Sequence, residues 1–154
     1  MLGLQMINIV GWVKGLILGC VFVVVSASGY ASPMDCFVGE WDWSNSSGTM
    51  TFSIDLKKQG GRIYGQYCAV AQNGNKIDCD DEESQNIDGV IGGDGKSAVV
   101  NFNSFFGAKN GEAFLRMVGG RLIWHVVRNP SEGEFYAPKD AILVPHQFMM
   151  KKAK

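Results

Sequence analysis

Residues 112–127 read EAFLRMVGGRLIWHVV, and this stretch decides the fold. Two runs of alternating side chains flank Gly119-Gly120, a two-residue loop of the kind that closes an antiparallel hairpin. Pairing outward from this loop places Leu115 opposite Trp124. The stretch therefore predicts two antiparallel strands with one face in the core. The predicted core-facing residues are Ala113, Leu115, Met117, Leu122, Trp124 and Val126.

Period-two alternation, broken by Gly and Asn turns, recurs along the rest of the chain. It predicts strands at 37–44, 49–56, 62–70, 75–80, 85–91, 97–105, 112–118, 121–127 and 141–145. No stretch after residue 31 keeps the 3.6-residue period of an amphipathic helix. Sequential strands of even spacing predict an all-β fold, a small antiparallel up-and-down barrel of about eight or nine strands.

Composition bounds the class of protein. The chain has 154 residues, of which 46% are hydrophobic and 19% charged, with 14 basic and 15 acidic side chains. This length allows one domain. An ordinary apolar fraction and a near-zero net charge exclude disorder of the whole chain. They also exclude a strongly basic nucleic-acid binder, so no nucleic-acid partner is expected.

Residues 1–31 have the pattern of a secretory signal peptide. The uncharged run at 15–25 follows Lys14 and is too short for a membrane-spanning helix, which needs about 20 residues. Small residues come next, and the small-x-Ala rule allows cleavage after Ala27 or Ala31, of which we favour Ala31.

Two alternatives to export by a cleaved signal remain for this region. One is a transmembrane anchor over 6–25, and the other is a lipoprotein modified at Cys20. The signal-peptide interpretation predicts a periplasmic or secreted protein. Its mature chain, 32–154, would be a single β-barrel domain with no integral membrane span.

Three cysteines remain after the signal, which in an oxidising compartment indicates one disulfide and one further thiol. Asn73-Gly74 favours a type I′ hairpin turn. Pairing outward from that turn sets Cys68 opposite Cys79, at a distance that a disulfide accepts. We therefore predict the disulfide Cys68–Cys79. Cys36 is then a buried thiol or pairs between two chains, which would give a homodimer.

The second face of the 112–127 hairpin is unusually apolar for a surface strand, and basic groups are mixed into it. Either the segment 134–148 covers this face or the face binds a partner protein. Lys109 lies in a Gly-rich loop, 107–111, of the kind that an inhibitor can insert into an enzyme. The predicted partner-binding residues are Phe114, Arg116, Arg121, Ile123, His125 and Lys109.

No catalytic motif, metal-ligand spacing or phosphate loop is present, so the chain is predicted to be no enzyme and to hold no cofactor or metal. The acidic run at 78–83 fails the EF-hand spacing, which makes it a solvated loop by prediction. No sequence motif supports Cys36 as a nucleophile with His125 as its base. Nothing fixes the separation of the loop carboxylates Glu132, Glu134 and Asp140.

Residues 39–50 read GEWDWSNSSGTM. The opening Gly-x-Trp is similar to the start of calycin barrels, and Trp-x-Asn-x-x-Gly-Thr at 43–49 resembles the avidin group more closely. Gly-Gln-Tyr at 65–67 adds to this likeness. The resemblance implies a barrel with a small ligand bound at its mouth. The ligand-binding residues that it implies are Trp43, Asn45, Thr49, Tyr67 and Trp124.

In size, export and absence of catalytic residues, the chain more loosely resembles small exported bacterial barrels that inhibit envelope enzymes or give immunity to injected toxins. That likeness implies an inhibitor or immunity protein whose partner is an enzyme, which is our leading hypothesis. The small-ligand barrel is the alternative. An enzyme, the third hypothesis, would need His125 beside a carboxylate in a cleft.

The barrel interior separates the first two hypotheses. A cavity on the order of several hundred Å³ favours the small ligand. A filled interior favours the protein binder, and the side chains expected to fill it are Met50, Phe52, Tyr67, Phe102 and Trp124.

Overall fold

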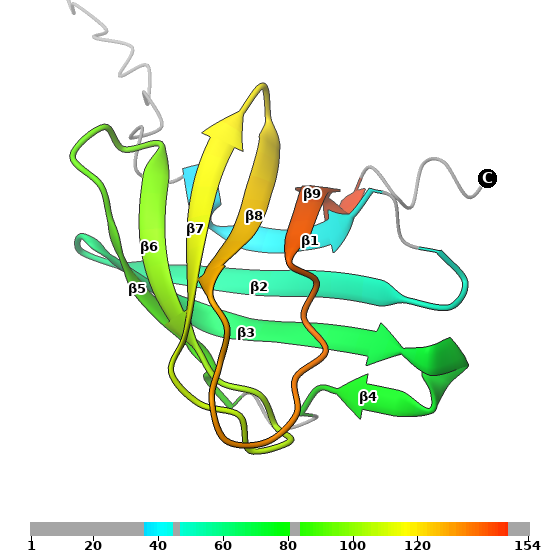
Figure 1. Ribbon diagram of the computed structural model, residues 1–154. Helices are drawn as coiled ribbons and strands as arrows, with labels where there is room; N and C mark the ends of the chain where they lie inside the picture. Colours follow the sequence, from blue (N-terminus) through cyan, green and yellow to red (C-terminus); the bar gives the residue numbers. More distant parts are fainter. Residues whose placement is uncertain (1–35, 45–46, 81–83, 148–154) are drawn as a thin grey trace, which may run out of the picture. The chain divides into compact units, whose positions relative to one another are not determined.

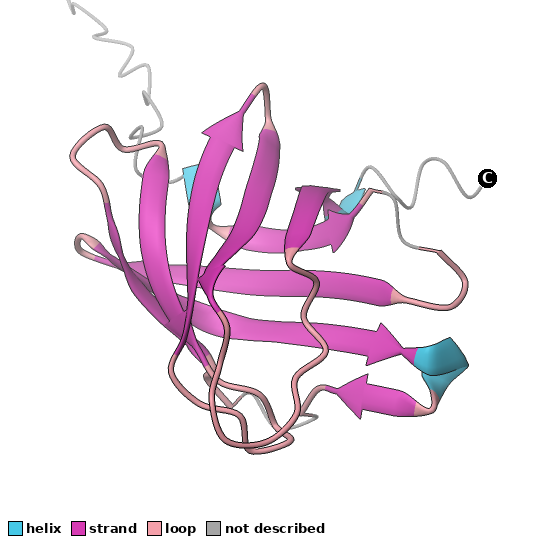
Figure 2. Ribbon diagram, in the orientation of Figure 1, coloured by secondary structure: helices cyan, strands magenta, loops and turns pink. Residues whose placement is uncertain are grey.

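The computed structural model describes residues 36–44, 47–80 and 84–147, so the predicted signal peptide lies outside the described residues. The described residues form nine strands and almost no helix (Figure 1 and Figure 2). The strands are β1 (Gly39–Trp43), β2 (Thr51–Gln59), β3 (Arg62–Ala71), β4 (Lys76–Asp78), β5 (Ile87–Ile91), β6 (Ser97–Phe102), β7 (Gly111–Val118), β8 (Arg121–Arg128) and β9 (Asp140–Pro145).

Eight of these strands close into an antiparallel barrel. The order is β2-β1-β9-β8-β7-β6-β5-β3, and pairing of β2 with β3 completes the circle. β4 lies outside the barrel and pairs only with the second half of β3, because β5 occupies the first half. The predicted all-β barrel is confirmed, and closure leaves the eight strands without free edges.

The β7–β8 hairpin has the predicted register. Leu115 lies opposite Trp124, and Gly119 and Gly120 both adopt positive φ, at 57° and 75°. Two consecutive positive φ angles twist a turn in the sense that antiparallel strands require, and glycine reaches them without a steric cost. The predicted core face of this hairpin is buried, apart from the half-buried Met117.

The β3–β4 hairpin also has the predicted turn. Asn73 and Gly74 have φ of 57° and 89°, and one backbone hydrogen bond of 3.2 Å spans the turn. The resulting register brings Cys68 and Cys79 to a Cα separation of 4.5 Å, and the predicted disulfide joins them. Cys36 lies outside this disulfide, half-buried, and its thiol donates a hydrogen bond to the carbonyl of Gly95.

Aromatic rings fill the barrel interior. Phe52, Tyr67, Phe102 and Trp124 contact one another around a ring, with centroid separations between 5.2 and 6.0 Å. All four are at most 2% exposed. Four of the five predicted interior side chains therefore meet, while Met50 lies half-buried before β2.

One end of the barrel is organised by Asp78, at the end of β4. Its fully buried carboxylate accepts hydrogen bonds from the hydroxyls of Tyr67 and Ser104 and from the backbone N–H groups of Phe105 and Tyr136, at 2.8–3.2 Å. The prediction of a solvated loop for the acidic run is thus wrong at Asp78. Four donors replace the water that this carboxylate would lose on burial.

The C-terminal segment does not cover the second face of the 112–127 hairpin. β9 lies within the barrel wall, between β8 and β1. The preceding residues close the barrel end, where Phe135 packs on Phe102 and Pro138 accepts a hydrogen bond from the Trp124 indole. The prediction that the segment 134–148 covers this face is therefore wrong for residues 134–147, the part of the segment that the structure describes.

Candidate functional site

The outer surface of strands β5 to β9 carries two rows of side chains, which we call the outer face. Residues that lie opposite each other in neighbouring antiparallel strands project on the same side of the sheet. The first row is Val90, Val99, Phe114, His125 and Asp140. The second row is Ser97, Arg116, Ile123 and Ile142.

The outer face exposes large apolar side chains. Val90 and Val99 in the first row are 55% and 49% exposed, and Ile142 in the second row is 39% exposed. A sheet that faces only water alternates to polar residues on that side. Clustered apolar groups of this kind are typical of a surface that contacts another molecule.

Arginines border this apolar surface. Arg128 pairs with Glu112 at 3.2 Å, and Arg62 pairs with Asp88. By contrast, Arg121 makes no ion pair within the described part of the chain. Arg116 makes none within 4 Å either, although its charge helps hold the pKa of Asp94 below the usual value. The main cause of that lowered pKa is the hydrogen bond from the Lys96 backbone N–H to the Asp94 carboxylate.

A hollow of about 410 Å³ opens beside the second row. Its lining is mostly apolar and consists of Trp43, Ile123, Trp124, Asp140, Ala141 and Ile142. Asp140, at its rim, contacts Nδ1 of His125 at 2.5 Å. A shallow apolar hollow at the margin of an exposed apolar face can receive one anchoring side chain of a partner.

The outer face brings together four of the six predicted partner-binding residues: Phe114, Arg116, Ile123 and His125. Arg121 lies at the far end of the hairpin, opposite Val118. Lys109 is not part of the face. It precedes β7, at the other end of the hairpin, where its backbone pairs with Ser131.

The residues implied by the avidin resemblance lie in different surroundings, although Trp43 and Trp124 both line the hollow beside the second row. Tyr67 and Trp124 are 1% and 0% exposed and belong to the aromatic core. Thr49 is exposed, and its hydroxyl shares a hydrogen bond with Ser47. Trp43 is half-buried and borders the hollow, while Asn45 lies outside the described residues.

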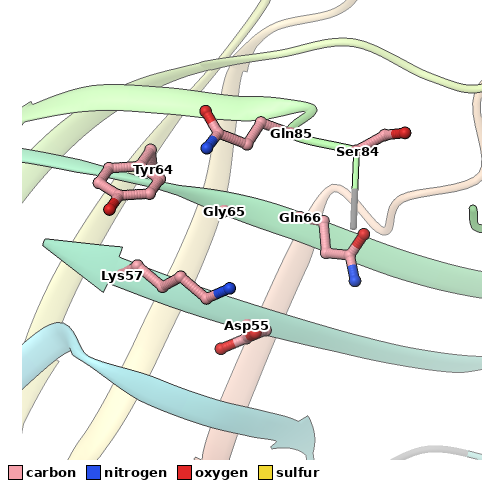
Figure 3. Close-up of a pocket in the computed structure, with 7 residues that line it drawn as sticks. All are labelled: Asp55, Lys57, Tyr64, Gly65, Gln66, Ser84 and Gln85. Atoms are coloured by element: carbon pink, nitrogen blue, oxygen red, sulfur yellow. The ribbon is translucent and has the colours of Figure 1, made fainter. Parts of the chain in front are cut away.

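The opposite side of the barrel, over β2 and β3, is polar. Figure 3 shows Asp55 and Lys57 on β2 beside Tyr64 and Gln66 on β3, around a depression of about 270 Å³. The Oε1 atom of Gln66 is buried there without a hydrogen-bond partner among the described residues. No sequence motif marks this depression, since its residues alternate with core positions along two unremarkable strands.

Among the described residues, no group of three or more His, Cys, Asp or Glu side chains is placed to hold a metal ion. The same part of the chain contains no helix long and apolar enough to cross a membrane. No protein-family model matches the sequence, and comparisons with curated proteins and with solved structures give no match. The closed antiparallel barrel with the Cys68–Cys79 disulfide is therefore established by the structure alone.

Proposed function

We propose that this barrel is an exported, non-enzymatic binding protein that inhibits, or gives immunity to, a secreted or injected enzyme. Contact would be made through the outer face of β5 to β9. The observation that carries the proposal is the pair of cross-strand rows in which exposed apolar side chains lie beside Arg116 and His125. Aromatic and arginine side chains in an apolar setting are the usual anchors of protein interfaces.

The charges on the outer face suggest the chemistry of the partner. Arg116 and Arg121 are exposed and form no ion pair in the described residues. A partner surface with an apolar centre and carboxylates at its rim would complement them. The hollow beside Ile123 and Ile142 would take an apolar side chain from the centre of that surface.

The filled interior supports this function over the small-ligand barrel. A ligand would have to displace Phe52, Phe102 or Trp124 from mutual contact at the centre of the core. Removing such side chains from a packed core costs several kcal/mol, on the order of 3–5 for a large aromatic. The Tyr67 hydroxyl, a polar contact in the avidin-like alternative, is already bonded to Asp78.

An enzymatic role has one observation in its favour, the contact between His125 and Asp140 beside the hollow. Both side chains are exposed, at 45% and 68%. The His125 ring makes no second hydrogen bond to a described residue, so no hydroxyl or thiol is held there as a nucleophile. Nucleophilic catalysis with His125 as the base needs such a group, and we therefore favour binding over catalysis.

The test is a pull-down from native envelope extract of the producing organism, with residues 32–154 as bait. Two bait variants change the charge of the outer face. Arg116→Glu reverses a positive charge, and His125→Glu adds a negative charge. Lys57→Glu, on the polar side of the barrel, is the matched control. We expect the wild-type bait to retain one enzyme in stoichiometric amount and to inhibit it. The affinity of that enzyme for the Arg116→Glu bait should be at least about tenfold lower than for wild type.

Equal capture by Arg116→Glu, His125→Glu and wild type would place the contact elsewhere and overturn the outer-face site. A co-purifying small molecule that is lost on Asn45→Ala, with no retained protein, would replace the proposal by the ligand barrel. Turnover of a substrate that stops on His125→Gln would replace it by an enzyme.

A further inference from the structure

A second surface feature, made of residues that are not part of the outer face, surrounds the ammonium group of Lys76. The Lys76 Nζ lies 5.5 Å from the ring centroids of both Phe106 and Tyr136. It also lies 3.2 Å from a carboxylate oxygen of Glu134. The two rings are nearly perpendicular, with centroids 5.3 Å apart. We call Phe106, Glu134 and Tyr136 the aromatic box.

The walls of the aromatic box are held by contacts that do not involve Lys76. The Phe106 backbone N–H donates to the Ser104 hydroxyl, and that of Tyr136 donates to buried Asp78. The Tyr136 hydroxyl donates to Glu134. A backbone bridge between Gly107 and Glu134 ties the two loops together, and they lie side by side at the same end of the barrel in Figure 1. The position of these walls therefore does not rest on Lys76.

β4, which carries Lys76, is likewise fixed without this contact. The Cys68–Cys79 disulfide anchors the end of β4, and Asp78 is held by four donors. A lysine whose strand is already secured has little to add to the stability of the fold. The chemistry of the box is instead that of a cation-recognition site, because two ring faces and a carboxylate converge on one point.

We propose that the aromatic box binds an ammonium group carried by another molecule, and that Lys76 occupies the site until it is displaced. The site is open to solvent, since the side chains of Lys76 and Glu134 are 34% and 63% exposed and Phe106 is 42% exposed. Exposed cation–π contacts and exposed ion pairs are individually weak. The resident ammonium therefore leaves often enough for a competitor to enter.

The ionisation of both partners agrees with this geometry. Hydrogen bonding to Tyr136 and then to Glu134 raises the pKa of Lys76. Hydrogen bonding to Tyr136 and then to Lys76 lowers the pKa of Glu134. The lysine and the carboxylate thus both stay charged at neutral pH. The box then presents a fixed negative charge to any cation that replaces Lys76.

The experiment titrates the purified protein, expressed from the full-length sequence, with tetramethylammonium chloride and separately with N-acetyl-lysine methylamide. Binding is followed through the amide NMR signals of residues 104–107 and 133–137, against sodium chloride at equal ionic strength. The proteins compared are wild type, Lys76→Gln, Lys76→Gln/Phe106→Leu, and Lys96→Gln. Lys96, in the loop between β5 and β6, is a matched exposed lysine outside the box.

We expect Lys76→Gln to bind a probe about tenfold more tightly than wild type, because no resident competes. The double variant should lose that binding, and Lys96→Gln should behave as wild type. Preference for tetramethylammonium would indicate a methylated ammonium ligand, and preference for the lysine derivative would indicate a protein side chain. Either preference supports the site.

Failure of Lys76→Gln to bind either probe overturns the proposal. So does equal affinity of Lys76→Gln and wild type. A marked fall in the melting temperature of Lys76→Gln, with no gain in affinity for either probe, would show that the contact of Lys76 with the aromatic box only stabilises the fold. None of these outcomes depends on the outer face, so they are independent of the enzyme-binding proposal.

Discussion

The hydroxyl of Tyr67, from the centre of the barrel, donates a hydrogen bond of 2.8 Å to the buried carboxylate of Asp78, on the strand outside it. This bond joins the aromatic core to the two loops that close the barrel end, since the same carboxylate binds Phe105 and Tyr136. The backbone N–H of Tyr67 also donates a hydrogen bond to the Asn86 side chain. Tyr67 lies in the part of β3 that pairs with neither β4 nor β5. Hydrogen bonds to side chains thus take the place of strand pairing at this point of β3.

Replacement of Asp78 by Ala should be among the most damaging substitutions in the described chain. Four donors would lose their acceptor inside a dry site, and we expect the free energy of unfolding to fall by about 3 kcal/mol or more. Urea denaturation followed by tryptophan fluorescence measures this change. Glu40→Ala, at an exposed acid of β1, should stay within about 0.5 kcal/mol of wild type. A small effect at Asp78 would mean that the barrel end is held by other contacts.

Stability should decline in alkali because of Tyr67. Burial, and next the neighbouring Asp78 charge, raise the pKa of this phenol well above its ordinary value of 10.0. Above that pH the unfolded chain releases the Tyr67 proton while the folded chain keeps it. The free energy of unfolding then falls by up to about 1.4 kcal/mol per pH unit from this group. Below pH 10 its contribution is fully present.

Urea midpoints measured from pH 8 to pH 11.5 test this relation. Tyr67→Phe removes the titrating group, so its stability should fall less steeply than that of wild type above about pH 10. Parallel curves for the two proteins would contradict the assignment of the alkaline loss to Tyr67.

The Cys68–Cys79 disulfide should contribute about 2–4 kcal/mol, because it restricts the unfolded chain and fixes β4. The double variant Cys68→Ser/Cys79→Ser should lose this stability and should show faster amide hydrogen exchange in residues 104–107 and 134–137, which depend on β4 through Asp78. Cys36→Ser, outside the disulfide, is the control and should keep wild-type exchange in both loops. Unchanged exchange in the double variant would show that Asp78 stays in place without the bridge.

Gly65 lies where the backbone of β3 comes close to that of β2. A Cβ atom added there would lie 1.9 Å from the carbonyl oxygen of Asp55, so Gly65→Ala must push two barrel strands apart. We expect a loss of several kcal/mol, on the order of 3. Gly93→Ala is the matched substitution, because Gly93 has open space around it and needs no positive φ. Thermal denaturation of the two variants gives the comparison, and equal melting temperatures would contradict the steric argument.

The sequence predicts the strands well because their information is local. Period-two alternation and the loops Gly119-Gly120 and Asn73-Gly74 set both the strands and their register, and through register the disulfide. The predicted strand 97–105 is too long, however. It ends at Phe102, since Ser104 and Phe105 turn inward to bind Asp78.

The features that the sequence could not predict depend on residues far apart in the chain. Asp78 resembles its acidic neighbours, and only the folded loops supply its donors. Lys76 and Glu134 of the ammonium contact are 58 positions apart. The outer face, by contrast, was predicted at Phe114, Arg116, Ile123 and His125 because one hairpin contains them, whereas Val90, Val99 and Ile142 join it through the pairing of β5, β6 and β9 alongside that hairpin.

The pairing of β1 with β9 has a consequence for how the chain acquires its structure. Every other barrel contact except that between β3 and β5 joins strands that follow directly in sequence, so hairpins can form as the polypeptide is synthesised. Trp41, by contrast, lies opposite Pro145, near the end of the described chain. The nascent barrel therefore remains an open sheet with exposed apolar side chains until β9 has been synthesised, and closure waits for that strand. A fragment that stops before residue 140 would leave β1 and β8 without their shared neighbour and would be prone to aggregate through these open edges.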